Sequence, residues 1–436
     1  MQKTVAQKTK LAQLYNSPAW TLVAAFGTYF CTYGFRKPYT AATYEGASFF
    51  GIDYKFWLII SQTLGYVLAK WIGIKIVSEV QPNQRVNMLL RMILLAELLL
   101  LVFAVVPAPW NMLCLLLNGL SLGIVFGLVL GFLEGRKNTE ALVAGLCASF
   151  IVSDGVSKSV GAFLLNTGIS ENWMPSAAGI VFLPLTLLFL YMLRKINPPS
   201  AADIADRSKR VPMNTTARRD FFTKYWPGLT AISIAYLFVT LLRSIRADFA
   251  PELWSGLGYK QTPALFTQSE IIVSLGVMAI NGLAVFIHHH NRAFRFSLWT
   301  CIGGFCLLLL AVVSLPSGLP PFLFMVIAGL GVYLPYVAIH TTVFERLIAS
   351  TKEKATTGFL MYVVDSVGYT GYILLMLLRH LTPAGTSILS LFLSICICLG
   401  ITGIIVIVYS LFYFNNKNNI YAAASKRFAS GPSSHI

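Results

Sequence analysis

Long apolar segments constrain this sequence more than any other feature. A helix that crosses the hydrocarbon core of a bilayer needs about 20 mostly apolar residues. Segments of that kind lie near 17–43, 55–78, 86–107, 109–133, 139–167 and 175–195, and again near 226–250, 266–288, 293–315, 321–347, 354–380 and 384–414. The pattern predicts an all-α membrane protein with twelve transmembrane helices in two six-helix halves.

The composition agrees with a bilayer as the solvent. Only 11% of the residues are charged and 56% are hydrophobic, whereas soluble domains carry about 25% charged residues. The cysteines are scattered through the apolar segments, as at Cys31 and Cys147, and none forms a CxxC pair. We therefore expect neither a disulfide framework nor a metal site.

One long basic segment separates the two sets of helices. Lysines and arginines far outnumber aspartates between Arg194 and Lys224. We predict an N-terminal half at 1–196, a basic linker at 197–224, a C-terminal half at 225–414 and a tail at 415–436. Every second turn also carries a lysine or arginine, so the positive-inside rule predicts a cytoplasmic linker and cytoplasmic termini.

The halves also share a short motif. Tyrosine and arginine stand seven residues apart in the first helix of each half, at Tyr29 and Arg36 and at Tyr236 and Arg243. Seven residues make two helical turns, so each pair is predicted to share one helix face. Two six-helix halves joined by a basic loop resemble the major facilitator superfamily. That resemblance implies a substrate site between the halves near the bilayer midplane.

Ionisable residues inside the predicted helices are the candidate functional residues, because each costs about 2.5–3.5 kcal/mol at a helix centre on insertion scales. They are Arg36, Lys37, Lys70, Asp154, Lys158, Arg243, Arg246, Asp248 and Asp365. Arg36, Lys70 and Arg243 have no acid three or four residues away. The surplus of cations indicates that negative charge arrives as substrate, and the arginine fork suits phosphate or carboxylate oxygens.

For other candidates, a structural role is an alternative to a role in function. Asp154 and Lys158 stand four residues apart and are able to neutralise each other. Lys37 precedes Pro38, while Arg246 and Asp248 lie near a helix end, so snorkelling to the interface is an equal alternative for these three.

Three basic motifs resemble the organophosphate:phosphate antiporters, the exchangers of glycerol-phosphate and hexose-phosphate. The first is Tyr33-Gly34-Phe35-Arg36-Lys37, and the second is the glycine-containing turn closed by Lys70. The third is Arg243 followed by Asp248, Phe249 and Pro251. Two features depart from that family: Lys158 stands where it has a histidine, and only Ser78-Glu79 stands where it has an Asp-Arg pair.

The resemblance implies specific roles. Arg36 and Arg243 would hold a phosphorylated or phosphonate metabolite from opposite halves, and inorganic phosphate would be the exchanged anion. Lys70 and Lys158 would add positive charge near the site. The remaining residues expected at the substrate are Lys37, Tyr33, Tyr336, His340 and Tyr362, with Tyr333 as a further aromatic candidate for the cavity wall.

Two other functions stay open at this point. The first is a proton-coupled symporter of a carboxylate or other organic anion, with Asp154 or Asp365 as the proton carrier. The second is a non-transporting membrane sensor. We expect no enzyme activity, no cofactor and no nucleic-acid partner. The expected partners are a small anionic solute and the lipid bilayer, for a chain that functions as a monomer in a bacterial inner (cytoplasmic) membrane.

Overall fold

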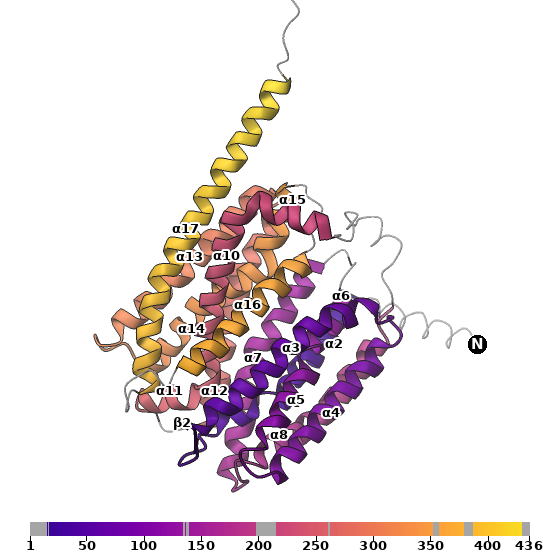
Figure 1. Ribbon diagram of the computed structural model, residues 1–436, viewed down its shortest axis with the longest axis vertical. Coiled ribbons are helices and arrows are strands. Elements are labelled where there is room, and N and C mark those ends of the chain that lie inside the picture. The colour runs from indigo at the N-terminus through magenta and orange to yellow at the C-terminus, as the bar shows by residue number, and fades with distance from the viewer. Residues whose placement is uncertain are drawn as a thin grey trace, which may run out of the picture.

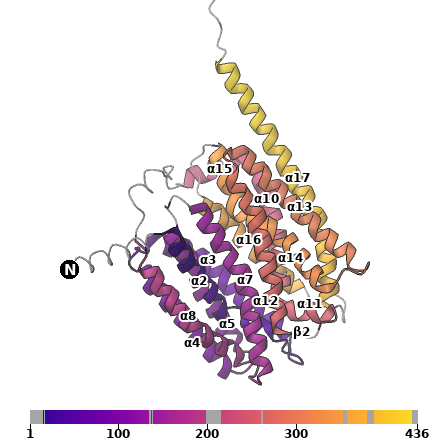
Figure 2. The same ribbon diagram turned by 180° about the vertical axis from the view of Figure 1, so that it is seen from behind.

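The computed structural model describes residues 15, 17–133, 136, 139–197, 215–259, 262–351, 357–378 and 387–429. Its helices run nearly parallel to one another, and the helices of the first half (indigo to magenta) lie beside those of the second half (rose through orange to yellow) (Figures 1 and 2). The two halves meet where α3 packs against α16 and where α7 packs against α12.

The first half contains six spanning segments. They are α2 (Pro18–Thr32) with its 3₁₀ continuations η1 (Tyr33–Phe35) and η2 (Pro38–Ala41), α3 (Tyr54–Glu79), α4 (Arg85–Val105), α5 (Met112–Leu122) with α6 (Val125–Leu133), α7 (Thr139–Asn166) and α8 (Met174–Arg194). A short antiparallel hairpin, β1 (Ser48–Phe49) with β2 (Ile52–Asp53), joins η2 to α3.

The second half repeats this arrangement. It consists of α10 (Thr215–Asp248), the short α11 (Ala250–Gly256), α12 (Pro263–Gly282) with η3 (Leu283–Phe286), α13 (His290–Ser314), α14 (Pro321–Ala338) with the π-helical turn η4 (Ile339–Val343) and α15 (Phe344–Thr351), α16 (Thr357–Leu377) and α17 (Ile388–Ala429). Helix α17 extends well beyond the rest of the bundle (Figure 1).

The prediction of an all-α, multi-pass membrane protein is confirmed. Ten helices of the described residues are long and apolar enough to cross a membrane. The other two predicted spans correspond to α2, which has only 15 residues before it becomes 3₁₀, and to α3, which carries Gln62 and Lys70 in its interior. The cytoplasmic placement of the termini stays a prediction.

Several boundaries differ from the sequence-based ones. Helix α10 begins at Thr215, inside the predicted linker, and α17 runs to Ala429, inside the predicted tail. The first predicted span is not one continuous helix, because α2 ends at Thr32. Consequently Tyr236 and Arg243 do share the helix α10, but Tyr29 and Arg36 do not share one helix.

Glycines bring two helices of the first half into backbone contact. A Cβ atom added to Gly65 of α3 would lie 1.9 Å from the carbonyl oxygen of Leu116, and one added to Gly119 of α5 would lie 2.1 Å from that of Gln62. Small residues allow this approach of helices within a bilayer. The contact fixes α3, which carries Lys70, to α5.

Candidate functional site

The break in the first helix places Arg36 at the centre of the bundle. In a bilayer, the carbonyl groups freed by such a break need partners inside the protein. The Gln62 side chain donates to the carbonyl oxygen of Arg36 at 2.9 Å, and the Asn118 side chain donates to that of Phe35 at 3.1 Å. Gln62 also donates to the Asn118 side chain at 3.0 Å. The polar pair on α3 and α5 thereby stabilises the non-helical segment that carries Arg36.

Arg36 and Arg243 are both buried, with 6% and 7% of their surface exposed. The Arg36 guanidinium lies 3.9 Å from the ring centre of Tyr66, and that of Arg243 lies 4.6 Å from the ring centre of Tyr336. Arg243 also donates to the Tyr369 hydroxyl at 2.9 Å. Neither arginine has a carboxylate partner among the described residues, and the Nε atom of each is buried without a hydrogen-bond acceptor.

Two tyrosines connect these arginines across the boundary between the halves. Tyr66 belongs to α3 and Tyr369 to α16, and their ring centres lie 5.1 Å apart in an edge-to-face arrangement. The order Arg36, Tyr66, Tyr369, Arg243 forms a continuous sequence of contacts from one half to the other. Cations are attracted to aromatic faces by about 0.5–2 kcal/mol each, which offsets only part of the cost of burying two guanidinium groups.

A second cluster of polar side chains lies on the boundary between the halves, and its members form an ion pair and hydrogen bonds with one another. Lys70 of α3 donates to Asp365 of α16 at 3.1 Å, and the other oxygen of Asp365 accepts a hydrogen bond from the Tyr236 hydroxyl. That hydroxyl lies 3.3 Å from Nδ1 of His340. His340 belongs to the π-helical turn η4, and its ring stacks on Tyr336 at 5.6 Å. π-helical turns are frequent at functional sites because they re-aim side chains.

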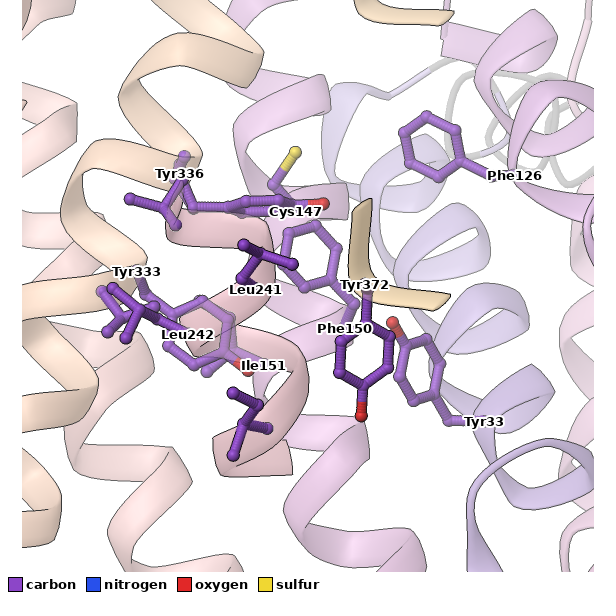
Figure 3. Packing of buried hydrophobic residues seen from close by; sticks show 14 of the residues in the cluster. Tyr33, Phe126, Cys147, Phe150, Ile151, Leu241, Leu242, Tyr333, Tyr336 and Tyr372 are labelled. Atoms are coloured by element: carbon purple, nitrogen blue, oxygen red, sulfur yellow. The ribbon is translucent and has the colours of Figure 1, made fainter. Parts of the chain in front are cut away.

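The space enclosed by these groups is small. Its volume is about 10 Å³, which is about the least that holds one water molecule. Figure 3 shows Phe150 of α7 beside Tyr336 of α14, whose ring centres lie 5.6 Å apart. The two halves are therefore packed closely around the site. Its walls are formed by Tyr29, Tyr33, Tyr66, Lys70, Phe126, Phe150, Tyr336, His340, Asp365 and Tyr369.

The structure brings together only some of the candidates from the sequence. Arg36, Arg243, Lys70, Tyr33, Tyr336, His340 and Asp365 lie in or against this space. The Tyr362 ring adjoins it, with its centre 5.3 Å from Nζ of Lys70. Tyr333 instead lies beside Arg246, with 5.9 Å between its ring centre and the guanidinium.

Lys37, Lys158 and Asp154 do not line the space. Lys158 forms an ion pair with Asp154, one turn away on α7. This arrangement agrees with the structural alternative, in which the two residues neutralise each other. Lys37 is buried and pairs with Asp248, at the end of α10 in the other half, so it lies neither on the wall of the central space nor at an exposed interface.

The number of unpaired cations is therefore smaller than the sequence predicted. The expectation was a surplus of positive charge from four cations, Arg36, Lys70, Lys158 and Arg243, at one site. In the described parts of the chain, five buried cations form ion pairs: Lys37 with Asp248, Lys55 with Glu252, Lys70 with Asp365, Lys158 with Asp154 and Arg246 with Glu270. The unpaired positive charge at the centre is that of Arg36 and Arg243. The sequence did not reveal the ionic partner of Lys70, because that partner, Asp365, lies 295 residues away along the chain.

Sequence reasoning also missed several groups. The most important are Tyr66 and Tyr369, although a signal for them exists. Tyr66 and Lys70 stand four residues apart on α3, and Asp365 and Tyr369 stand four apart on α16, so each pair shares one helix face. The inter-half pair of Lys55 and Glu252, at 2.5 Å, has no comparable signal because the two residues lie near the ends of separate helices, α3 and α11, and 197 residues apart.

Comparisons with known proteins agree with this architecture. The model of a family of unknown function, DUF5690, matches residues 38–417. The fold is similar to the crystal structure of a D-xylose-proton symporter, with a TM-score of 0.60, 12% identity, and coverage of 89% of this chain and 96% of that one. No curated protein matches the sequence. The chain thus has the fold of major facilitator superfamily transporters, as its twelve-segment pattern predicted.

Proposed function

We propose that this chain, which belongs to the family of unknown function DUF5690, is a secondary transporter of a small oxyanion, such as a phosphorylated or phosphonate metabolite, and that it exchanges this anion for inorganic phosphate. One observation carries the proposal. Two buried guanidinium groups, one from each half, lie against tyrosines that line the central space, and neither has a carboxylate partner in the described residues.

The chemistry of these groups favours an oxyanion. A guanidinium keeps its charge at any physiological pH and presents several N–H donors in a plane, which match phosphate or carboxylate oxygens. Arg36 and Arg243 would each contribute such donors, and the rings of Tyr66 and Tyr369 lie between them. An anion bound here would contact both halves at once.

That position also supports exchange. Without an anion, two like charges must stay buried in the closed protein, and an unpaired buried ion costs several kcal/mol. A bound anion removes this cost and favours the closed arrangement through which the site must pass when it changes sides. The protein should therefore reorient quickly when loaded and slowly when empty.

The test is counterflow of radiolabelled inorganic phosphate in proteoliposomes. Replacing Arg36 or Arg243 by lysine should reduce exchange at least about 100-fold, since an ammonium group does not reproduce the planar fork. Arg246→Lys is the matched control: Arg246 is also a buried arginine of α10, but it pairs with Glu270 and should retain exchange. Exchange near the wild-type rate for Arg36→Lys or Arg243→Lys would refute the two-arginine site.

A second candidate function is proton-coupled symport of an organic anion, and it has its own supporting observation. Asp365 bonds both Lys70 and Tyr236 on the wall of the central space, beside His340. Protonation of Asp365 would release Lys70 toward a bound anion. Under this function, a proton gradient would drive uptake into anion-free vesicles, and Asp365→Asn would abolish that uptake while preserving counterflow. Exchange predicts no uptake driven by the gradient.

A further inference from the structure

A pocket separate from the central site lies at one end of the first half. It has a volume of about 350 Å³ and is formed where α3 leads into α4, where α6 ends and where α8 ends. Arg85, Arg136 and Arg194 line it, and the described lining residues include no carboxylate. Apolar side chains, among them Val86, Phe132 and Leu193, form the rest of its wall.

Two of these arginines are fixed by backbone carbonyl groups. Arg85 donates to the carbonyl oxygen of Gly131 at 2.6 Å. Arg136 donates through Nε to that of Phe132 at 3.1 Å and through Nη2 to that of Asn197 at 2.5 Å. A guanidinium has five N–H donors, so the anchoring of Arg85 by one of them leaves others to face a ligand. The positions of both charges are thus set before a ligand arrives.

Gly131 has a specific role in this arrangement. A Cβ atom at this position would lie 2.6 Å from Nη1 and 2.8 Å from Cζ of Arg85. Gly131 is the last of four glycines spaced four residues apart, with Gly119, Gly123 and Gly127. Gly119 and Gly123 allow α5 to approach α3, whereas Gly131 makes room for the guanidinium of Arg85.

The beginning of α4 adds to the positive potential of the pocket. Helix α4 has 21 residues, and Arg85 is its first. The side chain of the preceding residue, Gln84, does not cap the helix. The first N–H groups of a helix attract anions, especially beside arginine side chains. The pocket therefore combines three guanidinium groups with the N-terminus of a long helix.

The surroundings of the pocket indicate what occupies it. Among the first-half helices that are long and apolar enough to cross a membrane, α4 and α8 are the least buried within the protein, with 33% and 39% of their apolar windows buried against 72% for α7. The pocket lies at the beginning of α4 and at the end of α8, and a helix of about 20 apolar residues has its ends near the lipid headgroups. Basic pockets between spanning helices at a membrane interface bind anionic headgroups, and the apolar part of the wall suits the glycerol and upper acyl region of a lipid.

We propose that this pocket binds the phosphate of an anionic phospholipid. Arg85, Arg136 and Arg194 contact the headgroup, and the partly exposed Val86 and Phe132 contact the start of its acyl chains. This site is independent of the central one, and the proposal does not depend on the transported solute.

The test measures lipid binding to the full chain in dodecyl maltoside micelles, by native mass spectrometry and by thermal unfolding. Phosphatidylglycerol should bind and raise the melting temperature, because a ligand of the folded state alone stabilises that state. Phosphatidylcholine should do so much more weakly. The combined variant Arg85→Gln, Arg136→Gln and Arg194→Gln should bind phosphatidylglycerol at least about tenfold more weakly.

Single variants separate loss of lipid binding from loss of folding, in case the triple variant does not fold. Arg194 is exposed, so Arg194→Gln alone should fold and weaken lipid binding several-fold. Gly131→Ala should displace Arg85 and act in the same direction. Arg292 and Arg295 are exposed basic residues of α13 outside the pocket, and their glutamine variants should bind the lipid as the wild type does.

Three results would overturn the proposal. Wild-type phosphatidylglycerol binding by Arg194→Gln and Gly131→Ala would remove the pocket from the site. Equal binding of phosphatidylcholine would exclude recognition of negative charge. Equal stabilisation by inorganic phosphate alone, lost in the same variants, would assign the pocket to a free anion instead of a lipid.

Discussion

Asp365→Asn isolates the electrostatic contribution of the pair that bridges the halves. Asparagine has nearly the same shape as aspartate, and its Oδ1 is still able to accept the hydrogen bond from Tyr236. What disappears is the negative charge next to Lys70. The charged atoms lie 3.1 Å apart, so their attraction is about 5 kcal/mol at an effective dielectric constant of about 20.

The expected loss of stability is somewhat smaller than this attraction. Removal of one partner from a buried ion pair costs about 3–5 kcal/mol. Lys70 keeps three aromatic neighbours, Tyr66, Phe126 and Tyr362, with ring centres 5.1–5.4 Å from Nζ. Such contacts each offset about 0.5–2 kcal/mol. We therefore expect Asp365→Asn to lower the free energy of unfolding by about 3 kcal/mol.

A double-mutant cycle in mixed detergent micelles measures this effect. Removing the stranded charge in Lys70→Met with Asp365→Asn should recover most of the loss, with a coupling energy above about 2 kcal/mol. Asp53→Asn is the control, because Asp53 is exposed and its charge should matter by less than about 0.5 kcal/mol. Inorganic phosphate should also stabilise Asp365→Asn more than the wild type, because Lys70 becomes available to an anion.

Two results would refute the reasoning. If Asp365→Asn unfolds within about 0.5 kcal/mol of the wild type, Lys70 does not depend on this partner. If the double variant is less stable than both single variants, the two side chains contribute through packing and not through their charges.

Three further substitutions test other parts of the structure. Asp154→Asn should lower the melting temperature by stranding Lys158, and adding Lys158→Met should restore it; unchanged stability of Asp154→Asn would instead favour a Lys158 that faces substrate. Gly119→Val should abolish the monodisperse peak in size-exclusion chromatography by separating two helices, while Gly303→Ala, with open space around it, should not. Asn118→Leu should lower the free energy of unfolding in mixed micelles by about 1–3 kcal/mol for each carbonyl group that loses its donor. A loss below about 0.5 kcal/mol would show that the break in the first helix does not need the Asn118 side chain.

The helices were predictable because the signal for each is local. About 20 apolar residues are sufficient to identify a span, and the alternating basic turns support the count. The 3₁₀ break after Thr32 was missed, although Gly34 and Pro38 mark it, because aromatic and small residues continue on both sides of Arg36 and Lys37. The π-helical turn at His340 has no comparable sequence signal, since it depends on the packing of α14 against its neighbours.

The candidate site was predictable only in part, for a physical reason. Burial of Arg36 and Arg243 follows from their place within a span, and both are buried. The ionic partner of a buried lysine, however, depends on which helices meet in space. Lys158 could be assigned a partner on its own helix, but Lys70 could not, because Asp365 belongs to the other half. The number of unpaired charges was therefore overestimated.

The close contact of α3 with α5 has a mechanical consequence. Sliding one helix along the other by a single residue would drive Cβ atoms into the carbonyl groups opposite Gly65 and Gly119. The two helices therefore move as one rigid body. Tyr66 and Lys70 lie on its inner side, and the exposed Leu113 and Leu117 lie on its lipid side. Any tilt that separates Tyr66 from Tyr369 must then displace Leu117 by a similar angle. A spectroscopic probe at that outer position would follow the opening of the centre without touching it.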